Sequence, residues 1–275
     1  MFTRPAARIA GLLLAAGSGR RYGRPKALVD TGDGPWVVRA IDALAGCDPI
    51  SVVVGARADE VAALLPAGVR AVRNDDFEQG MGSSLRCGLQ GLVARPDEDD
   101  VDAVVVMLVD LPDVGAPVVR RILASAGTDA LAGGVGAFGA AEAVEAAGPV
   151  EAGAAKAAGS SAAAGSRSGV RSALVRASYA GRPGHPVLLG RDHWPGVLAG
   201  ATGDEGARRY LADHQAVTVE CGDLASGRDI DRPIGRAGPP PGDEPKAPDN
   251  DRPGATSGRS RPVDPLPEVS PGSPR

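Results

Sequence analysis

The residues best able to do chemistry lie in a short run near the start of the chain, Gly17-Ser18-Gly19-Arg20-Arg21, with Lys26 five positions later. Glycine permits positive φ and close backbone approach, so consecutive N–H groups can converge on phosphate oxygens. The two arginines and the lysine add full positive charge, arginine through forked contacts and lysine as a mobile point charge. The run therefore predicts a binding site for a polyphosphate.

Two better-known phosphate loops do not fit this spacing. A Walker A loop has its lysine followed by Ser or Thr at the start of a helix, whereas Lys26 follows Pro25 and precedes Ala27. A dinucleotide fingerprint needs G-x-G-x-x-G, and here Gly23 comes one position late. The next expected strand runs into Ala56-Arg57 and not into an acidic residue. Both loops are excluded.

Asp110 is the second residue with a chemical signature. It follows seven consecutive apolar residues, 103–109, which predict a buried central strand. Ligands of open α/β sheets bind at the carboxyl ends of the strands, and a carboxylate there is costly unless it is solvated or paired. A magnesium ligand meets that condition. The alternative, an N-cap for a helix starting near Pro117, is disfavoured because Pro112 intervenes.

The elements that must position these residues alternate between helix and strand. Apolar periodicity and punctuation by Gly and Pro predict strands at 9–14, 50–55, 69–73, 172–179 and 216–220, and helices at 35–45, 59–65 and from about Ser83 onward. Such alternation implies βαβ crossovers. We therefore expect a three-layer α/β fold, with a mostly parallel sheet and helices on both faces.

The stretch Leu14-Ala15-Ala16-Gly17-Ser18-Gly19-Arg20-Arg21 with Pro25-Lys26 resembles the signature of the MobA-like NTP transferases, and most closely the molybdenum cofactor cytidylyltransferases. The resemblance implies a Rossmann-like, nucleotide-diphospho-sugar transferase-like fold. It implies transfer of an NMP from an NTP to a phosphate-bearing acceptor such as molybdenum-molybdopterin, with release of pyrophosphate. Residues 14–20 would bind the nucleotide, Arg21 the triphosphate, and Lys26 would be the catalytic lysine.

A second stretch, 74–89, resembles the part of these enzymes that surrounds the base and ribose. Its Gly80-Met81-Gly82-Ser83-Ser84-Leu85 string is similar to the cytidylyl branch, which favours CTP. The residues that the resemblance assigns to nucleotide binding here are Asn74, Gly80, Ser83 and Ser84. From the residues alone, serines at a helix start favour a plain N-cap over ligand binding, because serine caps are common.

The resemblance also implies a metal site and an acceptor site. Asp110, in an Asp-x-Pro string, and Asp231, in Asp-Ile-Asp-x-Pro, would hold Mg²⁺, with Asp229 as the alternative if the register shifts by two. His185 lies in Gly-His-Pro-Val-Leu-Leu, which is similar to the acceptor side of the branch, and we expect it in an exposed loop. Arg208 is a candidate contact to the acceptor phosphate.

Composition bounds the other classes of function. The net charge of −4 argues against a nucleic-acid binder, and the three cysteines, Cys47, Cys87 and Cys221, suit reduced thiols. The start of the chain has too little apolar length for a signal peptide, and no run is long enough to cross a membrane. We expect a cytoplasmic protein with small-molecule substrates. A molybdoenzyme or chaperone is the protein partner that the resemblance implies.

The domain prediction separates one folded unit from three biased segments. The nucleotidyltransferase domain is expected at 8–234, after a disordered start at 1–7. Within it, 26 of the 44 residues at 127–170 are Ala or Gly, which predicts a low-complexity insertion. Residues 235–275 contain 11 prolines in 41 positions and predict a disordered tail.

Two other functions remain open from the sequence. Some proteins that resemble this branch are nicotine blue oxidoreductases, which act with NAD(P)H on the same fold, although the chain lacks the acidic ribose residue and a second dinucleotide loop. A noncatalytic nucleotide sensor is the third interpretation, and the presence of Lys26, Asp110 and Asp231 argues against it.

Overall fold

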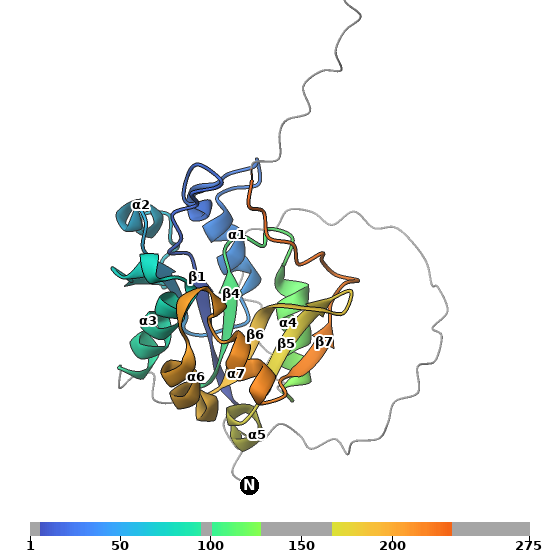
Figure 1. Cartoon of the computed structure of the whole chain (residues 1–275). Coiled ribbons are helices and arrows are strands. Elements are labelled where there is room, and N and C mark those ends of the chain that lie inside the picture. The colour runs from blue at the N-terminus through green and yellow to red at the C-terminus, as the bar shows by residue number, and fades with distance from the viewer. Residues whose placement is uncertain (1–5, 95–100, 128–166, 233–275) are drawn as a thin grey trace, which may run out of the picture. The chain divides into compact units, whose positions relative to one another are not determined.

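The computed structural model describes residues 6–94, 101–127 and 167–232. Within these ranges seven strands form one sheet in the order β3-β2-β1-β4-β6-β5-β7 (Figure 1). The strands are β1 (Arg8–Leu14), β2 (Ile50–Val54), β3 (Arg70–Arg73), β4 (Val101–Leu108), β5 (Leu174–Tyr179), β6 (Arg182–Gly190) and β7 (Val217–Glu220). The helices are α1 (Trp36–Ala43), α2 (Ala58–Ala62), α3 (Met81–Val93), α4 (Ala116–Ser125), α5 (Arg167–Arg171), α6 (Trp194–Gly200) and α7 (Arg208–Asp213).

The first half of the sheet is parallel, as the alternation of elements predicts. Strands β3, β2, β1 and β4 run in the same direction, and β1 pairs with both β2 and β4. Strand β6 then pairs antiparallel with β4 and with β5, and β7 is parallel to β5. The carboxyl ends of β1 and β4 therefore meet at one edge, so the glycine run after Leu14 and the carboxylate of Asp110 come together.

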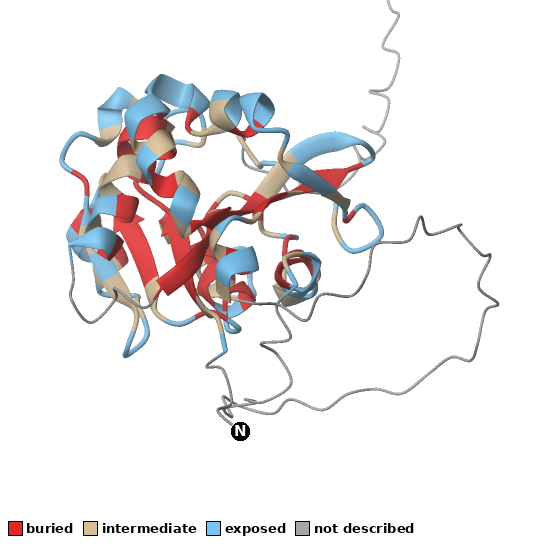
Figure 2. Cartoon of the chain, turned by 90° about the horizontal axis from the view of Figure 1, so that it is seen from below, coloured by how far each residue is buried: buried red, intermediate tan, exposed pale blue. Residues whose placement is uncertain are grey.

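Helices cover both faces of the sheet. On one face α1 and α4 pack over Leu13, Val105 and Met107, and on the other α3, α6 and α7 pack over Leu12, Val104 and Val106. Successive residues of β4 thus alternate between two cores, and nearly all of the strand is buried (Figure 2). Residues 103–108 of β4 are apolar without interruption because both faces of the strand pack against helices.

The sequence prediction is wrong in two places. Residues 182–190 form a strand, where the Gly and Pro residues predict a loop around His185. Long-range pairing decides the conformation, because Val187, Leu188 and Leu189 are buried between β4 and β5. Residues 167–170, placed in the low-complexity insertion, begin α5 and bury Val170. The rest of that insertion, 128–166, lies outside the described residues, as do 1–5 and 233–275.

Two further findings concern the described residues as a whole. None of their helices combines the length and the apolar character that crossing a bilayer requires. Cys47, Cys87 and Cys221 are free thiols, which fits the absence of any paired cysteine spacing in the sequence.

Candidate active site

The glycine run forms an open loop at the end of β1. Ala15 and Ala16 still bond to β2, where the Ala15 N–H donates to Val53 and the Ala16 carbonyl accepts from Ala56. After them, no backbone N–H of residues 17–20 has a hydrogen-bond partner within the described part of the chain. Gly19 has φ +63°, and a Cβ there would overlap the carbonyl of Arg24. The loop thus holds free donors in a shape that requires glycine.

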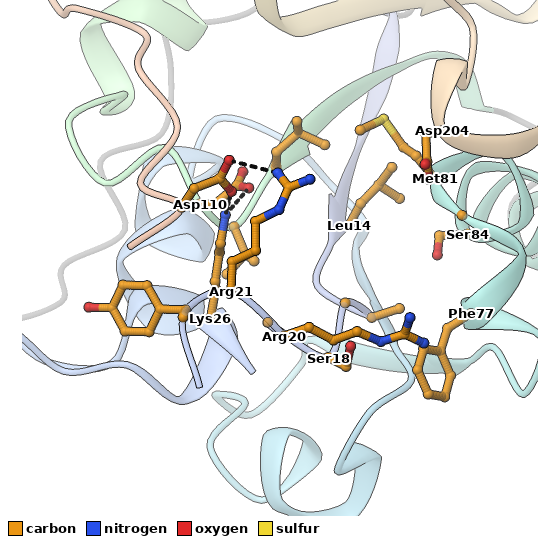
Figure 3. Close-up of a pocket in the computed structure, with 18 of the residues that line it drawn as sticks. Leu14, Ser18, Arg20, Arg21, Lys26, Phe77, Met81, Ser84, Asp110 and Asp204 are labelled. Atoms are coloured by element: carbon orange, nitrogen blue, oxygen red, sulfur yellow. Dashed lines mark hydrogen bonds and ion pairs between the residues drawn. The ribbon is translucent and has the colours of Figure 1, made fainter. Parts of the chain in front are cut away.

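Lys26 stands beside this loop at the start of a 3₁₀ turn, Lys26–Leu28. Its Nζ lies 3.0 Å from Oδ2 of Asp110 and 2.7 Å from Oδ1 of Asp231, and its side chain is only 13% exposed. Arg21 Nη1 lies 3.4 Å from the other oxygen of Asp231. Figure 3 shows Arg21 and Lys26 pointing toward these carboxylates from the loop side. The structure therefore brings four residues together through contacts that span 84 to 210 positions of the chain.

The turn after β4 fixes Asp110. The Val109 N–H donates to the Leu14 carbonyl, and Arg39 of α1 donates to the carbonyl of Pro112 at 2.9 Å. One carboxylate oxygen of Asp110 accepts from Lys26, whereas the other, Oδ1, is buried and has no hydrogen-bond partner among the described residues. A buried carboxylate oxygen without a donor is costly, and a cation would satisfy it.

The last described segment delivers two more carboxylates to the same place. Asp113 accepts hydrogen bonds from the N–H and the hydroxyl of Ser226, both at 2.6 Å, and the Ile230 N–H donates to the Asp110 carbonyl. As a result, one oxygen from each of Asp110, Asp229 and Asp231 lies within 4.8 Å of the others. Three carboxylates at this separation could hold a divalent ion through oxygen, which is the ligand type of Mg²⁺.

The charges of this cluster shift the pKa of two members. Burial lowers the pKa of Lys26, but the hydrogen bond to Asp231 and the charge of Asp110 outweigh it, so its pKa is raised overall. The hydrogen bond from Lys26, followed by its charge, lowers the pKa of Asp231. Both shifts favour the charged forms, so the lysine and this carboxylate stay ionised at neutral pH.

A cavity of about 450 Å³ opens above the loop. Its two ends differ in chemistry, with Arg21, Lys26 and Asp110 at one end and Phe77, Met81, Ser84 and Asp204 at the other (Figure 3). The predicted nucleotide residues that line it are Leu14, Ala16, Gly17, Ser18, Gly19, Arg20, Gly80 and Ser84. The arrangement suits an anionic chain at one end and, at the other, a flat group with hydrogen-bonding atoms at its edge.

Three residues predicted to bind the nucleotide do not line this cavity. Ala15 is buried in the core beneath the loop. Asn74 is also buried, and its amide donates to the hydroxyls of Ser83 and Ser84 at 3.0 and 3.1 Å. Ser83 in turn donates to the carbonyls of Asp76 and Gly80. These contacts hold the start of α3 in place, so Asn74 and Ser83 position the wall of the cavity.

A second cavity, of about 530 Å³, lies on the same face of the sheet and contains both predicted acceptor residues, His185 and Arg208. The expectation of an exposed loop for His185 is wrong, because the residue is half-buried in β6. Burial, followed by the charges of Arg176 and Arg208, lowers the pKa of His185 to about 4, so its imidazole is neutral at pH 7. Asp110 lines both cavities.

Sequence reasoning missed two residues of these walls. Asp204 lines both cavities. Gly82 allows this placement, since a Cβ there would lie 2.7 Å from the Thr202 backbone. Arg176 points into the second cavity from β5. A lone charge inside an apolar strand pattern was the one signal for it.

The chain is similar to a family of NTP transferases and to a curated relative. The family model of the MobA-like NTP transferase domain matches residues 11–217. Nicotine blue oxidoreductase from Paenarthrobacter nicotinovorans is 29% identical over 235 residues, which make up 81% of this chain and 92% of that protein.

Three solved structures show the same fold. Rv0371c from Mycobacterium tuberculosis H37Rv aligns with a TM-score of 0.57 and 23% identity over 83% of this chain and 95% of that one. A second structure of Rv0371c, a complex with manganese, gives a TM-score of 0.51 and 21% identity over 79% and 88%. A nucleotidyl transferase from Methanothermobacter thermautotrophicus aligns with a TM-score of 0.54 and 21% identity over 82% and 92%. The seven-stranded sheet is therefore that of the nucleotide-diphospho-sugar transferase fold.

Proposed function

The chain belongs to the MobA-like NTP transferase family, and from this premise we propose that it transfers an NMP unit, CMP in particular, from an NTP to a phosphate-bearing acceptor such as molybdenum-molybdopterin. The observation that carries the proposal is the position of Asp110. It lies where the two cavities meet, and it pairs with Lys26 at the anionic end of the first. Two substrates lying in the two cavities would bring their reacting ends together at this carboxylate.

The chain's own residues supply binding and orientation. The free N–H groups of residues 17–20 and the guanidinium of Arg21 would hold the β- and γ-phosphates, which leave as pyrophosphate. Lys26 would contact the α-phosphate, because its three donors can serve a phosphate oxygen and a carboxylate at once. An acceptor oxygen would then attack the α-phosphorus in line with the departing pyrophosphate, so catalysis rests on alignment and on neutralising charge.

The residues present fit a divalent ion. Asp110 forms a group of carboxylates with Asp229 and Asp231, and its Oδ1 has no hydrogen-bond partner among the described residues, so we assign Mg²⁺ to these three carboxylates. Asp231 lines the first cavity and Asp229 the second, so both members of the Asp-Ile-Asp string have a place. A bound ion of this kind supplies Lewis-acid stabilisation of negative charge on the triphosphate.

The preference for CTP rests on the start of α3. Met81 and Ser84, from the string that resembles the cytidylyl branch, line the end of the first cavity away from Lys26. That end offers the hydroxyl of Ser84 and the carboxylate of Asp204 together with apolar atoms, and we expect it to contact the base (Figure 3). The cytoplasmic location and a molybdoenzyme or chaperone partner remain predictions of the resemblance.

A second candidate function follows from the 29% identity to nicotine blue oxidoreductase, namely hydride transfer from NAD(P)H on the same fold. One set of assays separates the two candidates. Purified protein is given each NTP in turn with Mg²⁺ and a molybdopterin acceptor, and pyrophosphate release is measured. It is then given NADH or NADPH with a dye acceptor, and the absorbance of the reduced cofactor at about 340 nm is followed.

The transferase proposal expects pyrophosphate release that requires both CTP and the acceptor, together with no cofactor oxidation. Oxidation of NAD(P)H without pyrophosphate release would replace it with the oxidoreductase. Binding of CTP without either reaction would leave the nucleotide sensor.

A further inference from the structure

The second cavity combines an apolar interior with charge at one side. Its floor is formed by Val106, Leu108, Val187 and Leu189 of the sheet, and Leu85 and Leu211 of the covering helices line it as well. A cavity of about 530 Å³ with such walls suits the body of a small organic ligand. The position of its polar groups then decides which ligand is oriented there.

Arg176 is the unusual member of these walls. It lies in β5, where it pairs with Val187 of β6 on one side and with Thr218 of β7 on the other. The side chain is half-buried, and its Nε atom is buried with no hydrogen-bond partner among the described residues. A guanidinium nitrogen taken out of water without an acceptor costs free energy, so the residue is poorly explained by folding alone.

Arg208 adds a second guanidinium to the same cavity from the start of α7. The two arginines are close enough to affect each other, since burial and then the charge of Arg208 lower the pKa of Arg176. Asp204, Glu205 and Asp229 line the cavity too, yet in the described part of the chain none forms an ion pair with either arginine. Two neighbouring guanidinium groups with which no carboxylate of the described residues forms an ion pair keep their donors available for a bound anion.

We propose that Arg176 and Arg208 together bind an acidic group of the acceptor, a phosphate or a carboxylate, while its apolar body lies against the floor of the cavity. That this ligand is the acceptor rests on the proposed function. It names the class of molecule, amphipathic and anionic, and it adds Arg176 to the binding residues. The neutral imidazole of His185 lines the same cavity and can donate one further hydrogen bond to the group.

The geometry allows the acidic group to be either of two parts of the acceptor. Arg176 lies opposite Val187, which lies opposite Val106, four residues before Asp110. Strand spacing and rise place the Cα atoms of Arg176 and Asp110 roughly 15 Å apart. Allowing for the reach of the side chains, one phosphate could span the remaining gap, and so could an acceptor that carries a second acid.

The first test measures anion binding without turnover, with inorganic phosphate as the probe. The full chain is saturated with a nonhydrolysable CTP analogue and Mg²⁺, so that the nucleotide cavity is filled, and phosphate is titrated by calorimetry. We expect the wild-type protein to bind phosphate, and Arg176→Gln and Arg208→Gln each to weaken binding roughly tenfold or more. Arg209→Gln is the matched control, because Arg209 is the next residue of α7 and does not line the cavity. It should bind phosphate like the wild-type.

The outcomes of this titration are decisive in both directions. Unchanged affinity in both variants, or no phosphate binding by the wild-type, overturns the proposal. Arg208 is exposed, so its variant will fold even where Arg176→Gln does not. Without the analogue, the same titration in Lys26→Met shows whether phosphate still binds when the nucleotide end has lost its lysine. Since no step needs catalysis, a protein that releases no pyrophosphate can pass this test, and an active transferase can fail it.

A second measurement separates a ligand-binding arginine from a structural one. Arg176→Met keeps the aliphatic stem but removes the buried charge, so we expect the melting temperature of the ligand-free protein to rise or stay equal. Saturating phosphate should then stabilise the wild-type protein and not the variant. A clear fall in the melting temperature of ligand-free Arg176→Met would show that the arginine supports the fold, and it would overturn the proposal.

Kinetics with the acceptor identify which acidic group is held. If it is the attacking phosphate, Arg176→Gln and Arg208→Gln lower kcat and kcat/KM together; if it is a second acid, the KM for the acceptor rises while kcat stays near the wild-type value. The KM for CTP stays the same in both cases. Variants whose acceptor kinetics match those of the wild-type would contradict the proposal.

Discussion

The two clusters of positive charge in this protein differ in how the charge is balanced. Around the first cavity, Lys26 pairs with Asp110 and Asp231, and Arg21 pairs with Asp231. Around the second, Arg176 and Arg208 have no ion pair among the described residues. If the proposed function holds, a nucleotide and its metal would exchange places with existing partners, whereas an anion at the arginine pair would satisfy groups that have none. On that proposal the first cluster aligns the reacting groups and the second binds the acceptor.

The largest effect is expected from breaking the first cluster. Asp110→Asn removes a charge that pairs with Lys26 and lies between the cavities, and we expect kcat for pyrophosphate release to fall on the order of 10³-fold. Lys26→Met should cost about 10²-fold to 10³-fold. The measurement is steady-state turnover with CTP, Mg²⁺ and acceptor, with circular dichroism to confirm the fold.

The control for this prediction is Asp59→Asn. Asp59 is an aspartate on α2 with a side chain that is 91% exposed, paired with Arg73 far from both cavities. It should retain full turnover. An active Asp110→Asn enzyme would contradict the assignment of Asp110 and with it the contrast between the clusters.

A smaller effect should separate the two other carboxylates. Asp231 lines the first cavity and pairs with Lys26, while Asp229 is exposed and lines the second cavity. We expect Asp231→Asn to raise the KM for CTP and lower kcat by about 10²-fold, and Asp229→Asn to change the acceptor KM about tenfold with little effect on CTP. Equal changes for both substrates in both variants would mean that the two carboxylates are not divided between the cavities.

Much of this cluster could be predicted from the sequence, and the reason is local. The buried run before Asp110 and the glycines before Arg21 each encode a strand end, and parallel strands put their carboxyl ends at one edge. The position of Asp231 could be predicted only from the family resemblance. It depends on contacts such as that between Ser226 and Asp113, which have no local sequence signature. Short sequence motifs therefore predict most of the first cluster.

The second cluster could not be predicted in the same way. Gly184 and Pro186 indicate a loop, and only pairing with β4 and β5 makes 182–190 a strand. Arg176 becomes notable once this strand places it against Val187 and brings α7 over it with Arg208. The position of Arg176 depends on tertiary contacts, which local sequence patterns do not predict.

Acid stability should sharpen the comparison, because the pKa of His185 depends on its burial and then on the charges of Arg176 and Arg208. Burial lowers its pKa from the ordinary value of 6.5 to about 4 in the folded protein, so between these values the unfolded chain binds a proton that the folded one does not. The free energy of unfolding should therefore decrease as the pH falls from 6.5 to 4, by roughly 1 to 3 kcal/mol, and His185→Gln should remove this decrease. Urea denaturation across that range measures it.

An anion at the arginine pair should reverse part of this shift. Phosphate would offset the charges of Arg176 and Arg208, so the pKa of His185 should move upward when phosphate is added. The chain has three histidines, which makes assignment by NMR titration practical, and His193 and His214 serve as internal controls. A His185 pKa that ignores phosphate would place the anion elsewhere.

The smallest effect concerns Arg20. Its ion pair is exposed to solvent, whereas the Lys26 side chain is largely buried. Arg20 contacts Glu78 at 3.2 Å, but the two side chains are 77% and 70% exposed, whereas that of Lys26 is 13% exposed. Exposed pairs contribute little, so Glu78→Gln should change the free energy of unfolding by less than about 0.5 kcal/mol. Because the variant releases Arg20 at the rim of the nucleotide cavity, the Kd for CTP should stay equal or fall by up to roughly twofold. A variant that loses both stability and CTP affinity would show that Glu78 holds Arg20 in place, and the loop would then be as tightly balanced as the cluster around Lys26.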